Sequence, residues 1–331
     1  MRVLFAILAV LAATVAAQPA DTIIQYDPRL AAVLEPEPPI KTLATGFVWS
    51  EGPAWDHKRA RLYFSDVPEN KAYVWSADDG ARVFLAPSGL QSSQPGFRET
   101  GSNGLFVASG DRLLIANHGA RSVEAFDLAS GIRTTLASRF QNKRFNSPND
   151  TVEASDGTIY FTDPPYGLTG LNKSPIKELA HNGVYRLSVS GDVTLVDGSL
   201  TFPNGVALSP DEAFLYVAVS DPDAAVIYRY ARQADGSFGA RQVWFDATSY
   251  VRDGKPGLPD GLAIASSGHV FATGPGGVFI LSPSGEVLGQ IRLPKATANV
   301  TFGGEGSTLF ITSSDRLLAI DTLVVGAAWR D

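Results

Sequence analysis

The sequence predicts an all-β protein folded as a six-bladed β-propeller. Short runs rich in β-branched and aromatic residues alternate with Asp-Gly, Ser-Gly and Pro-Asp turns, which is typical of strands joined by tight turns. A pattern of three strands recurs six times at a spacing of about fifty residues, the length of one four-stranded blade. One further strand precedes the first repeat. A β-sandwich or a parallel β-helix is the alternative, but the coils of a β-helix are shorter.

Each repeat opens with a short strand that begins at an acidic or amide residue. Successive openings lie 39 to 56 residues apart. They occupy residues 51–55, 103–106, 149–152, 204–207, 260–263 and 299–302. The last repeat ends after its third strand, whereas residues 40–45 form a strand with no blade of its own. We therefore expect the N-terminal strand to join the last blade and close the ring.

The segments before the propeller have a different composition. Residues 1–17 carry one basic residue, then an apolar run that ends in small residues, which predicts a signal peptide and a periplasmic or secreted protein. That run is shorter than the roughly 20 residues that span a bilayer, and we expect no membrane span in the mature chain. Residues 18–39 are rich in Pro, Asp and Glu and are predicted to be a linker, followed by a single propeller domain over residues 40–331. Residues 174–180 are the only predicted helix, capped by Ser174.

Composition and missing motifs exclude several functions. The chain has no cysteine, which excludes thiol catalysis and thiolate metal sites. Its net charge of −7, without a basic run, argues against a nucleic-acid partner. Nothing in the sequence points to a protein partner. The sequence also lacks the Gly-x-Ser-x-Gly, His-Glu-x-x-His and P-loop motifs, so serine-hydrolase, zincin and P-loop functions are not supported.

An oxygen-bearing side chain stands at the same phase of all six repeats. Because the first strand of every blade lines the axis, these residues should form a ring around the channel. They are Glu51, Asn103, Asn149, Asn204, Asp260 and Asn299. Crowded carboxylates and amides with no cationic side chain among them predict one bound divalent cation. Oxygen ligands favour Ca²⁺, with Mg²⁺, Mn²⁺ or Zn²⁺ as alternatives, although turn chemistry would explain any one of these residues alone.

The second strands return to the same channel mouth because they run antiparallel to the first. Their ends place a second set of residues near the ring, namely Asp66, Asn117, Asp163, Asp221, Gly274 and Ser314. Three longer connections, over residues 89–100, 164–182 and 247–258, are expected to shape the pocket.

Motifs at these positions resemble those of the senescence marker protein/gluconolactonase/regucalcin family, and are most similar to the bacterial gluconolactonases. The matching stretches include Ser-Glu-Gly-Pro-Ala-Trp at 50–55, Arg-Phe-Asn-Ser-Pro-Asn-Asp at 144–150, and the Pro-Asn-Gly and Pro-Asp-Gly turns at 203–205 and 259–261. The resemblance covers about residues 40 to 321. It implies a six-bladed propeller with calcium or a similar ion held by Glu51, Asn149, Asn204 and Asp260, a choice that the ring alone does not make.

The usual chemistry of that family is the opening of a sugar lactone by water. We expect the lactone carbonyl to approach an open position of the ion and Asp260 to be the catalytic base, with Asp163, Asp221 and His118 in reserve. His118 has an ordinary interpretation as a solvated loop histidine. The predicted substrate-binding residues are Asn103, Asn117, Arg144, Tyr166 and Asn299. An esterase or phosphotriesterase on the same metal site, or a non-catalytic sugar- or calcium-binding propeller, are the alternatives, because fold alone does not name a substrate.

Overall fold

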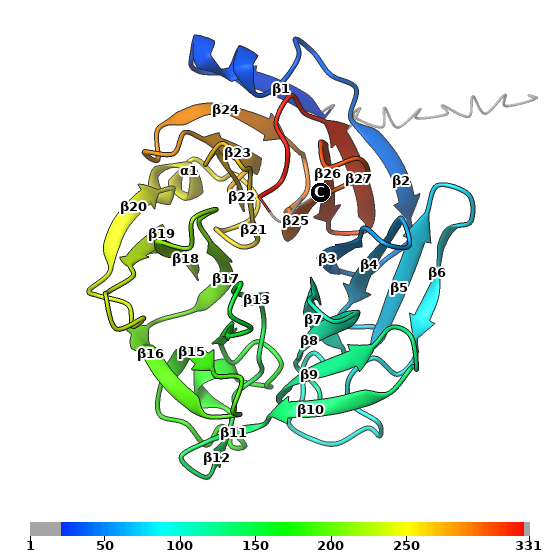
Figure 1. The fold of residues 1–331 in the computed structure, drawn as a ribbon, viewed down its shortest axis with the longest axis vertical. Coiled ribbons are helices and arrows are strands. Elements are labelled where there is room, and N and C mark those ends of the chain that lie inside the picture. The colour runs from blue at the N-terminus through cyan, green and yellow to red at the C-terminus, as the bar shows by residue number, and fades with distance from the viewer. Residues whose placement is uncertain (1–20, 328–331) are drawn as a thin grey trace, which may run out of the picture.

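The protein forms a six-bladed β-propeller, as predicted (Figure 1). The computed structural model describes residues 21–327. The first strands of the six sheets contact one another around the central axis. Over the described residues, no helix has the length and apolar character needed to cross a membrane. The predicted signal peptide, residues 1–17, lies outside the described residues, so export stays a prediction.

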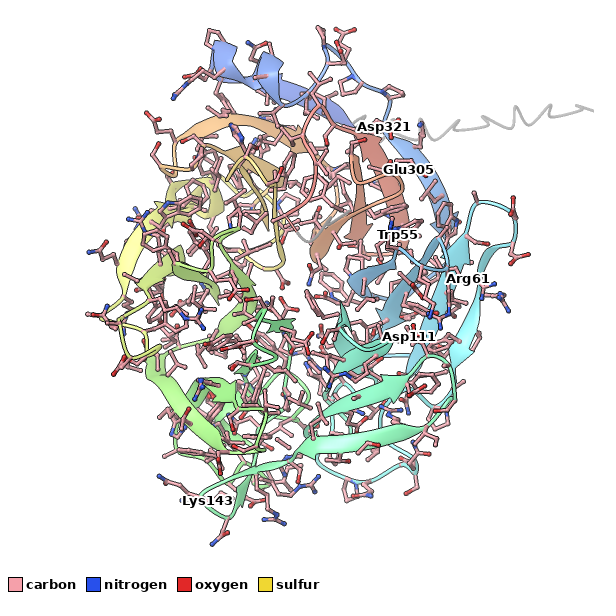
Figure 2. The ribbon with its side chains drawn as sticks, in the orientation of Figure 1. Trp55, Arg61, Asp111, Lys143, Glu305 and Asp321 are labelled. Atoms are coloured by element: carbon pink, nitrogen blue, oxygen red, sulfur yellow. The ribbon has the colours of Figure 1, made fainter. Side chains whose placement is uncertain are left out.

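The first three blades each contain four antiparallel strands in chain order from axis to rim. The first comprises β3 (Ser50–Asp56), β4 (Arg61–Asp66), β5 (Lys71–Ser76) and β6 (Gly80–Leu85). The second comprises β7 (Ser102–Ala108), β8 (Arg112–Asn117), β9 (Ser122–Asp127) and β10 (Arg133–Ala137). The third comprises β13 (Thr151–Glu153), β14 (Ile159–Asp163), β15 (Asn182–Leu187) and β16 (Val193–Leu200). Between the second and third blades, a small hairpin of β11 (Arg139–Phe140) and β12 (Lys143–Arg144) carries Lys143 at its outer tip (Figure 2).

The remaining three blades complete the circle in the same order. The fourth comprises β17 (Pro203–Leu208), β18 (Phe214–Asp221), β19 (Ala224–Ala231) and β20 (Gln242–Asp246). The fifth contains β21 (Leu262–Ile264), β22 (Val270–Gly274), β23 (Gly277–Leu281) and β24 (Val287–Arg292). The sixth contains β25 (Asn299–Gly303), β26 (Thr308–Ser313) and β27 (Arg316–Asp321).

The sixth blade takes its outer strand from the N-terminal part of the chain, which confirms the predicted closure. Strand β2 (Lys41–Thr45) pairs antiparallel with β27, and Lys41 lies opposite Ala319. The two strands, blue and red in Figure 1, come from distant parts of the sequence. An ion pair between Lys41 and Asp321 at 2.8 Å joins the same strands, but both groups are exposed, so backbone pairing and packing hold the closure.

The prediction of a linker over residues 18–39 is wrong for its described part. Strand β1 (Thr22–Gln25) pairs with β24 as a fifth strand on the fifth blade, and a short 3₁₀ helix, η1 (Pro28–Ala32), follows it. The few apolar residues of this segment enter the core between the fifth and sixth blades, namely Leu30, Val33 and Leu34. Covering β24 removes an exposed sheet edge. Leu30, Val33 and Leu34 have the i, i+3, i+4 spacing of a helix face, but the pattern covers only one turn and is too short to predict burial.

Each interface between neighbouring blades holds its own apolar cluster. Alternate residues of one strand point to opposite faces of its sheet, so a strand contributes to two clusters. In β14, Ile159 and Phe161 pack against the second blade, whereas Tyr160 packs against the fourth. The middle strands of each blade are covered on both faces by the neighbouring blades. Their successive residues are therefore apolar, which explains the continuous apolar runs in the sequence.

The helix predicted at residues 174–180 is not formed, and a short helix lies in another connection at the channel mouth. Residues 174–180 form a turn, preceded by a short 3₁₀ helix, η2 (Leu171–Lys173), while the five-residue helix α1 (Thr248–Arg252) was not predicted. Lys177 Nζ donates to the carbonyl oxygens of Leu179 and His181, which fixes the turn. A segment this short gains too little from helical hydrogen bonds to fold as a helix against such contacts.

Candidate active site

The structure brings the six predicted ring side chains together at one end of the channel, at or just before the inner strands. Exposed fractions are 3% for Glu51 and Asn149 and 5% for Asn103 and Asn204, whereas Asp260 is partly exposed. Asn103 Nδ2 donates to Asn149 Oδ1 at 3.1 Å, and Asn149 Nδ2 donates to Asn204 Oδ1. Asn204 also lies next to Asp260, where its amide opposes the rise of the Asp260 pKa. The remaining member, Asn299, is 7% exposed.

Glycines directly after the ring residues allow the inner strands to approach one another. A Cβ atom on Gly104 would lie 2.6 Å from the carbonyl oxygen of Asn149, and one on Gly205 would collide with the carbonyl oxygen of Asp260. Only glycine fits at such a close approach between backbones. Glycine follows four of the six ring residues, Glu51, Asn103, Asn204 and Asp260, and lets these four lie against the next blade.

Hydroxyl groups on the second strands hold the ring backbone in place. Each donates to a carbonyl oxygen of the following blade, at or next to its ring residue. The bonds run from Ser65 Oγ to Asn103 O at 2.8 Å, from Thr162 Oγ1 to Asn204 O at 2.6 Å, from Ser220 Oγ to Pro259 O at 2.6 Å and from Thr273 Oγ1 to Ala298 O at 2.9 Å. These bonds couple neighbouring blades where the ring side chains originate.

The second set of predicted mouth residues has a structural role. Asp163 is fully buried and accepts two backbone N–H bonds from the loop before β13, and burial raises its pKa to about 7. Asn117 is fully buried too, its Oδ1 accepting from Ala120 N and its Nδ2 donating to Glu124. Each of these residues stands one position after the channel-facing residue of its strand, so its side chain points to the other face. The prediction that Asn117 binds substrate is therefore not supported.

The two carboxyl groups of the ring lie near other acidic side chains. Burial raises the pKa of Glu51 well above its usual range, and the nearby charge of Asp150 adds to this shift, although hydrogen bonds from Gly52, Trp49 and Asn299 oppose it. Burial also raises the pKa of Asp260, and the charges that add to the shift are those of Glu51, Asp150 and Glu99, all negative. Asp260 Oδ1 is buried and has no hydrogen-bond partner.

His118 lies within the ring, so its interpretation as a solvated loop residue is wrong. Its side chain is fully buried, with Nε2 3.0 Å from Asn149 Oδ1 and 3.3 Å from Asn103 Nδ2. On its other side, Nδ1 is 3.2 Å from Glu99 Oε2, a contact within ion-pair distance that lacks the alignment of a formed hydrogen bond. The ring therefore includes a carboxylate–histidine pair that sequence analysis did not predict.

Two of the predicted pocket loops pair with each other beside the ring. Arg98 N donates to Gly167 O at 2.9 Å, and Thr169 N donates to Gly96 O at 2.8 Å. This pairing joins loop 89–100, which carries Glu99, to loop 164–182, which carries Tyr166. The backbone of one loop thus fixes the position of the other.

Tyr166 reaches the ring from its loop. Its ring stacks on Phe202 with centroids 5.8 Å apart, and its hydroxyl is buried without an aligned hydrogen-bond partner. Burial raises the pKa of Tyr166, and the charges of Asp260 and Glu99 add to this shift. The hydroxyl therefore stays protonated at neutral pH and available as a donor.

Arg144 does not join the ring. Its guanidinium donates to the carbonyl oxygen of Ala120 at 2.8 Å, and its backbone N–H donates to Glu178. Of the predicted substrate-binding residues, the structure thus gathers Asn103, Tyr166 and Asn299 at the ring and leaves Arg144 and Asn117 outside it.

Sequence analysis missed three residues of the site. Glu99 lies in a loop with no periodic signal, whereas Ser220 could have been found from strand alternation, one position before the predicted Asp221. Asp150 directly follows a ring residue, is 8% exposed and joins two blades by accepting from Val206 N at 3.0 Å. Burial raises its pKa to about 6.

A cavity of about 320 Å³ occupies the channel beyond the ring. Its walls are the later residues of the inner strands, mostly apolar. Asn299 is the one ring residue that lines it, and Asp150, which follows a ring residue, lines it too. Because the unpartnered carboxyl group and the buried histidine lie at the ring end, we place the chemistry there and not in this cavity.

The residues present suit a hard cation. The described part of the chain has no cluster of three or more His, Asp or Glu side chains in a metal-binding arrangement. The predicted set instead combines two carboxylates with two amides, a donor set suited to oxygen-seeking ions. Asp260 Oδ1 has no partner, and the charges that raise the Asp260 pKa are all negative. By donor chemistry and charge, Glu51, Asn149, Asn204 and Asp260 fit such an ion.

Fold and site define this protein as a six-bladed propeller with a buried ring of carboxylate and amide side chains at one channel mouth. The model of the SMP-30/Gluconolactonase/LRE-like region matches residues 49–315, and the chain belongs to this family. A gluconolactonase of Zymomonas mobilis is 41% identical over 92% of this chain and 87% of its own length. A 6-deoxy-6-sulfogluconolactonase of Pseudomonas putida is 31% identical over 81% of this chain and 84% of its own length. A solved gluconolactonase from Xanthomonas campestris superposes with a TM-score of 0.78 at 32% identity, over 91% of this chain and 95% of that one.

Proposed function

We propose that this protein opens a small-molecule sugar lactone with water, using one divalent cation, Ca²⁺, held by Glu51, Asn149, Asn204 and Asp260. The observation that carries the proposal is the buried ring with its two carboxyl groups. The charge of Glu51 raises the pKa of Asp260, and Asp260 Oδ1 has no hydrogen-bond partner. The relatives named gluconolactonase and 6-deoxy-6-sulfogluconolactonase support the choice of a sugar lactone. Such an ion, when bound, polarises the lactone carbonyl and favours the negative charge that develops on its oxygen.

Asp260 is our choice for the catalytic base. Water adds to the carbonyl carbon, the bond from that carbon to the ring oxygen breaks, and one water proton must reach the ring oxygen. The partly exposed Asp260 carboxylate can take this proton and return it to the ring oxygen, so it ends the reaction unchanged.

Three other side chains are placed to hold the substrate. Tyr166 offers a protonated hydroxyl without an aligned partner, which can donate to a sugar oxygen. Asn103 Oδ1 is buried and also lacks a partner, and Asn299 borders the cavity side of the ring. These groups match the hydroxyl-rich surface of a sugar lactone.

The test is a substrate panel on protein stripped with a chelator and reloaded with Ca²⁺, Mg²⁺, Mn²⁺ or Zn²⁺. We expect acid release from gluconolactone to fall at least about tenfold on stripping and to return best with Ca²⁺. An aryl ester and an organophosphate, run in parallel, should be turned over far more slowly. Faster turnover of either compound would favour an esterase or phosphotriesterase, and cation binding without any turnover would favour a binding protein. Lactone hydrolysis that survives complete stripping would refute the metal dependence.

A further inference from the structure

We infer that Glu99 and His118 form a positioning pair that turns the side-chain amide of Asn149 so that its oxygen faces the cation. This inference rests on the proposed function, because it concerns how one proposed ligand is oriented. An asparagine can present either its oxygen or its NH₂ group to a site, and only the oxygen can bind a metal ion. A neighbouring group must therefore fix the orientation of the Asn149 amide.

The neighbouring ligand Asn204 shows how such a selection works. Ser220 Oγ donates its single proton to Pro259 O at 2.6 Å, so toward Asn204 it can only accept. Asn204 accordingly donates Nδ2 to Ser220 Oγ at 2.8 Å, and its Oδ1 is turned toward Asn149. The orientation of Asn204 thus follows from where Ser220 places its proton.

His118 holds the corresponding position beside Asn149. Its Nδ1 faces the carboxylate of Glu99 at 3.2 Å, and its Nε2 faces Asn149 Oδ1 at 3.0 Å. A neutral imidazole carries one proton, so with this amide orientation one ring nitrogen must face an acceptor without a proton between them. An imidazolium would satisfy both contacts but would set a positive charge beside the cation.

Rotating the Asn149 amide by half a turn removes this conflict. The His118 proton then lies on Nδ1 toward Glu99, and the bare Nε2 accepts from Asn149 Nδ2. Asn149 Oδ1 now faces the same side as Asn204 Oδ1, so both amide oxygens point at the ion. This rotation gives up the bond from Asn103 Nδ2 to Asn149 Oδ1, and Asn103 Nδ2 keeps its contact with His118 Nε2 at 3.3 Å.

In this arrangement Glu99 acts through His118 and touches neither the ion nor the substrate. The carboxylate keeps the proton on Nδ1, the imidazole makes Nε2 an acceptor, and Asn149 must present its NH₂ group there. The loop pairing that fixes residues 96–98 against residues 167–169 also holds Glu99 in place. Glu99 and His118 are therefore positioning residues, and Asn149 is the group they position.

Glu99→Gln tests the inference with almost no change in size. The new amide can donate to Nδ1, which moves the histidine proton to Nε2 and draws Asn149 Oδ1 away from the ion. We expect Ca²⁺ affinity, measured by titration calorimetry, to fall about 10- to 100-fold. Glu178→Gln is the matched control, because it removes the same charge from the other mouth loop, and it should change affinity less than about threefold.

A second measurement reports the proton directly. The chain has 4 histidines, so nitrogen NMR shifts of histidine-labelled, Ca²⁺-loaded protein can be assigned with a His118→Asn variant. We expect a neutral His118 protonated on Nδ1 in the natural protein and on Nε2 in the Glu99→Gln variant. Unchanged affinity in that variant, or a His118 protonated on Nε2 in the natural protein, would overturn the inference while leaving the proposed function intact. Absence of any cation binding by the natural protein would overturn both, whereas cation binding without lactone turnover would overturn only the proposed function.

Discussion

The two ends of the central channel are built from the same six strands but differ in chemistry. At one end, residues at or just before the start of the inner strands supply carboxylates and amides, and His118 joins them from the turn after β8. Further along the same strands, side chains such as Leu208 and Val152 line an apolar cavity. The backbone is shared, so the contrast comes entirely from which residue type occupies each position along the strand.

This contrast separates residues expected to bind and react with the substrate from residues that stabilise the packing of the blades. Buried polar groups at the ring are unfavourable for folding unless they are paired, and Asp260 Oδ1 has no partner. Apolar residues at the far end stabilise the fold by leaving water. Changes at the ring should therefore alter activity more than stability, and changes at the far end should do the reverse.

The largest effect should come from Asp260→Asn at the ring. Removing the base should lower kcat/KM for gluconolactone about a thousandfold, because an amide cannot accept the proton of water. Since burial already disfavours the charged form of Asp260, the metal-free variant should be at least as stable as the natural protein in thermal unfolding. Thr301→Val, in the cavity wall, is the control and should keep activity within about twofold. Full activity in the Asp260 variant would refute the assignment.

At the opposite end, Leu208→Ala should destabilise without affecting catalysis. Leu208 is 9% exposed and packs in the cluster between the third and fourth blades. Its truncation should cost about 2–4 kcal/mol of unfolding free energy, measured with urea, and leave kcat/KM nearly unchanged. A large loss of activity at unchanged stability would contradict the division between the two ends.

Stability should depend on pH through the buried acid Asp163 at the ring end. Burial raises its pKa from 3.8 to about 7, so the folded state binds its proton more tightly than the unfolded state does. The stabilisation is complete below about pH 4 and is lost as pH rises through about 7, on the order of 4 kcal/mol in all. The stability difference between the natural protein and Asp163→Asn should fall across this window and be flat above about pH 8. A difference that does not change with pH would show that Asp163 does not titrate as described.

The smallest effect should follow Ser220→Ala. Two hydrogen bonds disappear, one to Pro259 O and one from Asn204 Nδ2, at a cost of about 1 kcal/mol. We expect a Ca²⁺ affinity several-fold weaker, because the Asn204 amide is no longer held in one orientation. Ser237→Ala, in an exposed turn, should leave both properties unchanged.

Sequence patterns predicted the fold and the ring because both depend on repetition. A polar residue at the same position of all six repeats must form a ring around the axis, and this result does not depend on the conformation of the loops. The N-terminal closure could be predicted from a strand without a blade. The docking of β1 and the residues after it could not, because the apolar spacing of Leu30, Val33 and Leu34 covers only one helical turn.

The parts of the site that were missed lack a repeating signal. Glu99 reaches His118 only because two loops pair across the mouth, a contact that no local pattern encodes. Asn117 and Asp163 are the last residues of β8 and β14, so they do lie at the channel mouth as predicted. Successive side chains of a strand point to opposite faces, so the residue one position earlier is the one that faces the ring.

The way the ring closes also sets an order of assembly. Strand β2 is made before the strands of the first five blades, whereas its partner β27 is made after them. Five blades can pair as their strands emerge, while the sixth must wait until most of the domain has been synthesised. Closing so long a loop costs entropy that grows only with the logarithm of its length, so the delay lies in translation and not in the strength of the final pairing.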